Sequence, residues 1–187
     1  MPRRGTTAAT ACSVAPPPET TTFAMESKLL YASQDGVTLF QVIGRGTYKI
    51  CPSFRKCCED LLAAKDVTGV TIDLSQCETM DSTFMGIMVM LGIKARGKIP
   101  LLVVNAKPAH RSLLDGIGVS RVWRFVNEPV TDLNWHNLAQ ASAGAIKDMT
   151  DLAPIILEAH QALIDLDPAN LPKFKDVVEL LKAEQQP

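Results

Sequence analysis

Residues 72–86 read Ile72-Asp73-Leu74-Ser75-Gln76-Cys77-Glu78-Thr79-Met80-Asp81-Ser82-Thr83-Phe84-Met85-Gly86. They join a β-branched, apolar run over residues 67–74 to a second apolar run over residues 84–93. A short run that is apolar on both faces is typical of a central strand. Asp, Ser and Thr directly before an apolar segment mark the N-terminus of a helix. The stretch therefore predicts a central strand, a short loop and a hydrophobic helix.

Further strands and helices are expected on both sides of this stretch. Runs rich in β-branched and aliphatic residues predict strands over residues 29–32, 37–43, 99–104 and 122–126. Helical spacing of apolar residues, opened by Pro52 and Pro108, predicts helices over residues 52–64 and 108–117. The first two strands flank the turn signal Gln34-Asp35-Gly36 and form a hairpin. The order β-β-α-β-α-β-α-β predicts an α/β fold with a mixed sheet and crossover helices.

The chain has 187 residues, which suits one domain of ordinary size with additional segments. We expect a disordered Thr-, Ala- and Pro-rich arm over residues 1–24, because such a segment cannot bury enough apolar surface to fold. A globular domain over 25–126 follows, then a connection over 127–149 that is helical from residue 130, and an acidic helical hairpin over 150–187. Translation from Met25 is an alternative start that omits the arm.

Within the predicted hairpin, apolar residues recur at helical spacing over residues 152–163 and 174–181. The pair Asp167-Pro168 separates the two helices; Thr150 or Asp151 is expected to cap the first, and Asn170 the second. An amphipathic hairpin must bury its apolar face somewhere. It can do so on its own domain or in a homo-oligomer formed through residues 150–187.

Charge is unevenly distributed, although the formal net charge is only −1. Residues 26–126 carry 13 basic and 9 acidic residues, whereas residues 127–187 carry 4 basic and 10 acidic ones. Basic residues crowd the second half of the domain at Lys94, Arg96, Lys98, Lys107, Arg111, Arg121 and Arg124. We expect this basic set to dock the acidic tail of the same or a neighbouring chain in a salt-sensitive way. Direct nucleic-acid binding is not expected, because aromatic residues are not interleaved with these charges.

Several function classes lack the residues they need. The longest strongly apolar stretch, residues 84–93, has about half the length of a membrane-spanning helix. Five cysteines without a C-x-x-C pair predict reduced thiols and a cytoplasmic protein, with one thiol of Cys57-Cys58 facing the core. The histidines are scattered at positions 110, 136 and 160 without metal-ligand spacing. No metal, cofactor or catalytic activity is therefore expected.

Two other motifs receive structural interpretations. Asp73 ends the predicted central strand, but no acidic pair near the first strand is present to hold Mg²⁺ for a phospho-aspartate site. Gly44-Arg45-Gly46 lacks the remaining residues of a phosphate-binding loop and is interpreted as a turn after the second strand.

Ser82 is the residue that points to a function. It lies at the start of the predicted hydrophobic helix, where backbone N–H groups and the helix dipole favour a phosphate. From the residues alone, a simple N-cap role for Ser82 or Thr83 is the preferred interpretation, because caps are common.

Four features of the chain resemble the STAS domain of bacterial anti-sigma factor antagonists. They are the element order, the Asp81-Ser82 pair, the glycine four residues after Ser82, and the segment Leu113-Leu114-Asp115-Gly116-Ile117-Gly118-Val119. The resemblance covers residues 26–126. It implies a non-catalytic, partner-switching regulator of transcription and signal transduction. A partner that is both anti-sigma factor and serine kinase would phosphorylate Ser82, with Thr83 as the alternative acceptor and a serine phosphatase as a further partner. The implied partner-binding residues are Asp81, Ser82, Thr83, Phe84 and Met85.

One departure from the family pattern leaves a second interpretation open. Phe84 stands where the family usually has Gly, and an aromatic ring there is expected to crowd the turn that a kinase must approach. The alternative is a STAS-type scaffold or accessory subunit, in a signalling complex or a lipid transporter, without a phosphoswitch. In that case the hydrophobic helix and the acidic hairpin make permanent contacts, and Ser82 is a cap.

Overall fold

The computed structural model describes residues 27–128, 130, 133–138 and 152–184. Its strands are β1 (Lys28–Gln34), β2 (Val37–Gly46), β3 (Gly69–Asp73), β4 (Cys77–Met80), β5 (Leu101–Val104), β6 (Arg124–Val126) and β7 (His136–Asn137). Its helices are α1 (Cys51–Ala63), α2 (Ser82–Ala95), α3 (Pro108–Asp115), α5 (Ala153–Leu166) and α6 (Leu171–Glu184), with 3₁₀ turns η1 (Val119–Arg121) and η3 (Pro168–Asn170). The predicted arm over residues 1–24, the start at Met25 and the caps Thr150 and Asp151 lie outside the described residues.

The strands form the mixed sheet that the sequence predicts. The order is β6-β5-β3-β2-β1-β7, with β1 antiparallel to β2 and β7, and with parallel pairs β2–β3, β3–β5 and β5–β6. Asp35 and Gly36 both have positive φ, as the tight turn between β1 and β2 requires. A Cβ on Gly36 would also lie 2.8 Å from the carbonyl oxygen of Asp66. Strand β3 is buried along its whole length, which confirms it as a central strand.

Three local predictions are wrong. Residues 77–80, expected within a loop, form β4, which pairs in parallel with the end of β2. Gly44 and Gly46 do not form a separate turn; they belong to β2, whose register shifts next to Gly44. Residues 136–137, expected within a helical connection, form β7 on the outer edge of β1. Each of these short strands is stabilised by a neighbour distant in sequence, so local periodicity does not detect it.

Helix α2 is buried on nearly every side. Ten of its 14 residues are buried, including Phe84, Ile87, Met88 and Leu91. A helix that is apolar all round must be covered on more than the face that meets the sheet. In this chain α5 provides the second cover, because Ile155, Ala159, Ala162 and Leu163 join the same core cluster as α2.

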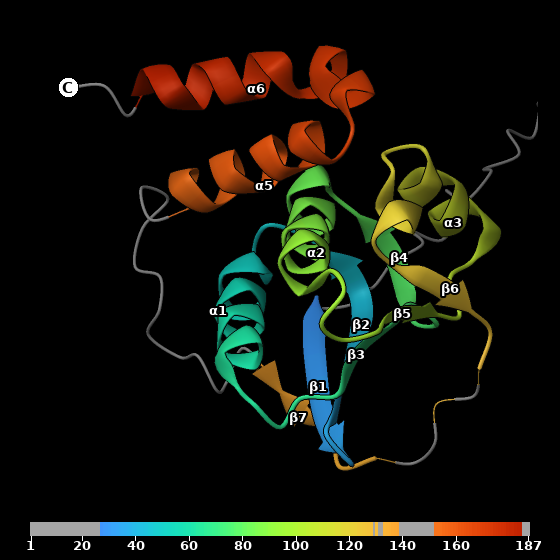
Figure 1. Cartoon of the computed structure of the whole chain (residues 1–187). Coiled ribbons are helices and arrows are strands. Elements are labelled where there is room, and N and C mark those ends of the chain that lie inside the picture. The colour runs from blue at the N-terminus through green and yellow to red at the C-terminus, as the bar shows by residue number, and fades with distance from the viewer. Residues whose placement is uncertain (1–26, 129, 131–132, 139–151, 185–187) are drawn as a thin grey trace, which may run out of the picture.

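The layers are visible in Figure 1: the sheet, then α1 and α2, then α5, and finally α6 on the outside. The predicted C-terminal helices are therefore present, and their apolar face packs within the chain. A homo-oligomer through residues 150–187 stays a prediction. In the part of the chain that the structure describes, no helix is long and apolar enough to cross a membrane.

Candidate functional site

Asp81 organises the start of α2. Its Oδ1 accepts a hydrogen bond from the backbone N–H of Phe84 at 2.8 Å, which makes Asp81 the N-cap of the helix. Its Oδ2 accepts from the N–H of Tyr48 at 2.7 Å, which ties the loop before α1 to the same carboxylate. The interpretation of Ser82 or Thr83 as the N-cap is therefore wrong: Asp81 performs that role, and the hydroxyl of Ser82 is left for another partner.

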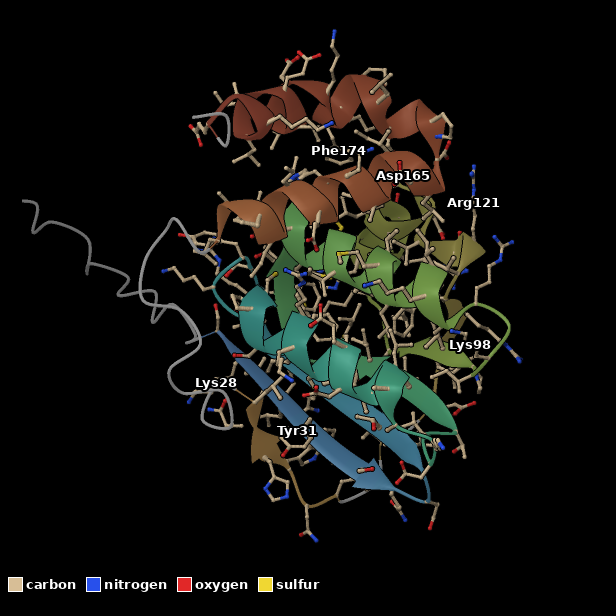
Figure 2. The ribbon with its side chains drawn as sticks, turned by 60° about the vertical axis from the view of Figure 1, so that its left-hand side comes forward. Lys28, Tyr31, Lys98, Arg121, Asp165 and Phe174 are labelled. Atoms are coloured by element: carbon tan, nitrogen blue, oxygen red, sulfur yellow. The ribbon has the colours of Figure 1, made fainter. Side chains whose placement is uncertain are left out.

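That partner is His160 of α5. Ser82 Oγ lies 2.8 Å from His160 Nε2, and His160 Nδ1 lies 2.7 Å from the carbonyl oxygen of Ile156. A carbonyl oxygen can only accept, so Nδ1 carries a proton, and Nε2 accepts the Ser82 O–H in the tautomer that is protonated at Nδ1 alone. His160 is only 3% exposed, and its ring meets the edge of Phe174 at a centroid distance of 5.4 Å. Figure 2 shows Phe174 between α6 and α5.

The other residues expected at a partner interface face inward. Thr83, Phe84 and Met85 are buried, with exposed fractions of 5%, 0% and 4%. The Phe84 ring stacks on Phe54 of α1 at a centroid distance of 5.2 Å and also contacts Gly46. Phe84 therefore fills the core, and the expectation that it crowds the outer surface of the first turn is wrong. Asp81 and Ser82 are the half-buried members of the expected set.

At Gly86 the backbone of α5 lies very close to α2. A Cβ built on Gly86 would lie 2.4 Å from the carbonyl oxygen of Ala159 and 2.7 Å from its Cβ. Since contacts this short do not occur, only glycine permits this separation of the two helices. Gly86, one full turn after Ser82, thus brings the α5 backbone over the first turns of α2.

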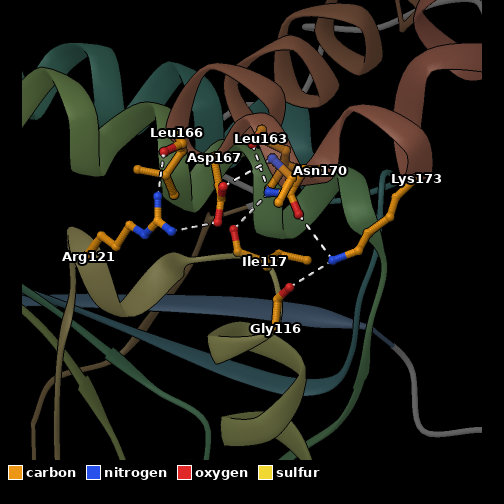
Figure 3. Close-up of polar contacts among 9 residues, drawn as sticks. Gly116, Ile117, Arg121, Leu163, Leu166, Asp167, Asn170 and Lys173 are labelled. Atoms are coloured by element: carbon orange, nitrogen blue, oxygen red, sulfur yellow. Dashed lines mark hydrogen bonds and ion pairs between the residues drawn. The ribbon is translucent and has the colours of Figure 1, made fainter.

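A second set of contacts fixes the far end of α5 (Figure 3). The buried Asn170 donates from Nδ2 to the carbonyl oxygens of Ile117 and Leu163 at 3.0 and 2.9 Å. Lys173 donates to the carbonyl oxygen of Gly116 at 2.8 Å. Asn170 was expected to cap α6, but its amide instead joins α5 to the segment after α3. Asp167 caps the intervening 3₁₀ turn by accepting from the N–H of Ala169.

The basic set meets the acidic hairpin at one described ion pair. Arg121 Nη2 lies 2.7 Å from Asp167 Oδ2, and Arg121 also donates to the carbonyl oxygen of Leu166. A second bridge, Arg55 to Glu158 at 2.8 Å, starts from α1, outside that set. Arg111 pairs with Asp115 within α3 and lies over the Phe125 ring. Docking of the hairpin within the chain is thus chiefly apolar, and charge contributes less than the sequence suggested.

Two cavities flank these contacts. One of about 430 Å³ lies where α1, α2 and α5 meet; its lining includes Arg55, Met90, Ile93 and Asp165. The other, of about 600 Å³, lies beside β5 and β6 and is lined in part by Arg96, Arg111, Arg121 and Arg124. Ser82 lines neither cavity.

The remaining candidates are structural. The buried Asp73 carboxylate accepts from Gln41, from Asn105 and from both the backbone and the hydroxyl of Ser75, so it joins the middle of β2 to the ends of β3 and β5. Cys58 is buried and Cys57 is half-buried, as expected for one core-facing thiol. Burial raises the pKa of Cys57 and of Cys77 to about 11, which keeps both thiols neutral. Among the described residues, no group of three His, Cys, Asp or Glu side chains could hold a metal ion.

The family model of the STAS domain matches residues 28–130. This chain belongs to the STAS family. The match ends before α5 and α6, so the hairpin that contacts Ser82 lies outside the matched residues.

Solved structures similar to this chain include anti-sigma factor antagonists. One, from Mycobacterium paratuberculosis, is 21% identical, with 55% of this chain and 87% of that chain covered and a TM-score of 0.49. The unphosphorylated form of SpoIIAA is 12% identical, with 57% and 90% covered and a TM-score of 0.46. The phosphorylated Bacillus cell fate determinant SpoIIAA is 16% identical, with 56% and 93% covered and a TM-score of 0.42. No curated protein matches the chain.

Sequence reasoning missed His160 and the contact between Gly86 and Ala159. One signal was present: residues 84–93 are apolar on every face, and a single sheet cannot cover such a helix. His160 also falls in step with Ile156 and Leu163 on the apolar face of α5. A polar residue in that stripe indicates a buried partner, although spacing alone does not identify the partner as Ser82.

Proposed function

We propose that this STAS protein is a non-catalytic, partner-switching regulator that binds an anti-sigma factor with serine kinase activity and is released when Ser82 is phosphorylated. One observation carries the proposal. Ser82 opens α2 directly after the Asp81 cap, and its half-buried hydroxyl is not consumed by capping. Thr83, the alternative acceptor, is 5% exposed and therefore less accessible than Ser82.

The switch follows from charge. Transfer of the γ-phosphoryl group of ATP forms a bond from Ser82 Oγ to phosphorus, breaks the bond to the ADP oxygen and releases the hydroxyl proton. The product carries about −1.5 to −2 additional charge next to the Asp81 carboxylate. A partner surface that must desolvate this turn of α2 then meets two neighbouring negative groups, which weakens association. A serine phosphatase would reverse the change.

The direct test incubates the full chain with ATP and the anti-sigma-type kinases of its host and measures the mass. We expect a gain of one phosphoryl group, located on Ser82 by peptide mapping. Ser82→Ala should abolish the gain, whereas Ser120→Ala, which removes an exposed serine elsewhere, should leave it unchanged. A stable complex without any mass gain on Ser82 would contradict the phosphoswitch.

Binding provides the second test. Ser82→Asp places a negative charge at the same turn, and we expect it to weaken the complex with the kinase relative to wild type. Ser82→Asn, similar in size but uncharged, is the matched control and should bind more tightly than Ser82→Asp. Equal affinity of the wild type and Ser82→Asp for the kinase would contradict release by the added negative charge.

A second function is favoured by the packing of α5. Because Gly86 and Ala159 are in close contact and α5 residues belong to the core cluster, α5 could serve as a permanent layer of the protein. The chain would then act as a STAS-type scaffold or accessory subunit of a signalling complex or lipid transporter, with Ser82 joining α2 to α5. A stable complex that survives ATP treatment without phosphorylation would support this alternative.

A further inference from the structure

The C-terminal hairpin covers the surface on which the proposed switch depends. Helices α5 and α6 lie beyond the residues that match the STAS family, yet α5 packs on α2 at the turn that contains Ser82. Figure 1 shows α5 directly outside α2, with α6 beyond it. A partner approaching this face of α2 meets this chain's own helices first.

Contacts with α5 follow one face of α2. Ser82 bonds to His160, and Gly86 touches Ala159 one turn later. Further along α2, Met90 and Ile93 line the cavity of about 430 Å³ together with Ala162 and Asp165 of α5. The contact is therefore tight at the turn that would be phosphorylated and looser at the far end of α2.

Docking of α5 and phosphorylation of Ser82 use the same hydroxyl group. In the docked state Ser82 Oγ lies 2.8 Å from His160 Nε2, and one turn later the backbone of Ala159 leaves no room for a Cβ on Gly86. A phosphoryl group on Oγ removes the donated proton and adds three oxygens at this position. The O–H···N bond that joins this turn to α5 is then lost, and a kinase that takes the proton from Oγ competes with His160 for the same hydroxyl group.

The anchors of the hairpin allow it to open. Away from Ser82, α5 is held mainly by apolar contacts with α2. Its polar anchors are two ion pairs with one exposed partner each, Arg55–Glu158 and Arg121–Asp167, and the bonds of Asn170 and Lys173. Exposed ion pairs contribute little each. The outer helix α6 leaves Leu171, Val177 and Leu180 exposed. Local opening of a terminal helical unit costs less free energy than unfolding of the central sheet.

We infer that the hairpin of α5 and α6 is an intramolecular cover that competes with the kinase partner for the α2 surface around Ser82. This inference rests on the proposed function for the identity of the competitor, but the cover itself can be tested without any partner. Opening precedes both partner binding and phosphorylation, and phosphorylated Ser82 keeps the cover open.

The test measures access to position 82 in the full chain. Ser82→Cys introduces a thiol there, and peptide mapping after treatment with N-ethylmaleimide at neutral pH follows its labelling. Ala159→Leu, added to this background, wedges α5 away from Gly86. Ala183→Leu on the exposed end of α6 is the matched control. Hydrogen exchange of β3 reports in each variant whether the central sheet is folded.

We expect Ala159→Leu to raise the labelling rate about tenfold or more, and Ala183→Leu to leave it within about twofold, while β3 stays protected. Equal labelling rates in all three proteins would overturn the cover. If β3 of the Ala159→Leu variant loses its protection from hydrogen exchange, the Asn170→Ala variant is used instead. This substitution removes the hydrogen bonds to the carbonyl oxygens of Ile117 and Leu163. Faster labelling in that variant supports the cover, and an unchanged rate rejects it.

Kinase treatment separates the two proposals. Faster phosphorylation of Ser82 in the Ala159→Leu variant, made in the wild-type Ser82 background, supports both. If thiol labelling accelerates but Ser82 is phosphorylated in neither protein, the cover stands and the proposed phosphoswitch fails. If Ser82 is phosphorylated at the same rate in both proteins and labelling is also unchanged, the phosphoswitch stands and the cover fails.

Discussion

The Ser82 hydroxyl and the His160 imidazole form a hydrogen bond of 2.8 Å that joins the first turn of α2 to α5 across 78 positions of sequence. The bond connects the capped serine of the STAS domain to a segment that the family model does not include. Its geometry makes the C-terminal hairpin part of the candidate site and underlies the following predictions.

His160→Ala should lower the free energy of unfolding by about 2–3 kcal/mol. The variant leaves a cavity next to Phe174 and leaves the Ser82 hydroxyl without its partner. Urea unfolding followed by circular dichroism measures the loss. His136→Ala, at an exposed histidine of β7, is the control and should change stability much less. Equal losses in the two variants would contradict the role assigned to His160.

Gly86→Ala should destabilise the protein by about 1–3 kcal/mol, because the new methyl group overlaps the backbone of Ala159 and α5 must shift. Gly69→Ala is the matched change, since a Cβ there meets Pro100 only at ordinary contact distance, 3.4 Å. Differential scanning calorimetry compares the two proteins. A Tm for Gly86→Ala as high as that of Gly69→Ala would show that the close approach of α5 is not required.

Salt should affect docking of the hairpin only slightly, because the contact is mainly apolar. Arg121→Ala removes an exposed ion pair with Asp167 and should cost no more than about 1 kcal/mol. Asn170→Ala should cost about 1–3 kcal/mol, because it removes the side-chain donor to the carbonyl oxygens of Ile117 and Leu163, of which, among the described residues, only Leu163 keeps a second donor, the N–H of Asp167. Hydrogen exchange of α5 at low and high salt checks both expectations. A large loss of protection at high salt in the wild type would show that ionic contacts, rather than apolar contacts, hold the hairpin on the domain.

Alkaline pH should destabilise the protein through its thiols. Burial raises the pKa of Cys77 from 9.0 to about 11, and burial, with a smaller contribution from Asp81, raises the pKa of Cys51 further. A raised pKa means that the folded state holds the proton more tightly, so this stabilisation is complete below pH 9 and is lost as the pH rises towards and beyond 11. Urea midpoints at increasing pH above 8 measure the effect. Cys77→Ala should flatten the decline, and an unchanged slope would contradict the assignment.

Much of the fold follows from local chemistry. Asp35 and Gly36 adopt positive φ in a two-residue hairpin turn, Pro108 opens α3, and the β-branched run of β3 forms a central strand, as their residue types favour. Strands β4 and β7 escaped prediction because they are short and depend on pairing with β2 and β1. Their stability arises from partners far along the chain, which no local pattern encodes.

In the candidate site, too, some features follow from the local sequence and others depend on tertiary packing. Asp, Ser and Thr before an apolar run place Ser82 at the start of α2, since capping involves only residues within one turn. Three further features depend on how α1, α2 and α5 pack. Asp81 caps the helix, Phe84 points into the core, and Ser82 bonds to His160. Helix capping and the spacing of apolar residues involve only residues that are close in sequence, so both can be predicted from the sequence. Which apolar face covers α2 depends on shape. Because Gly86 has no side chain, the backbone of α5 can pack directly against α2.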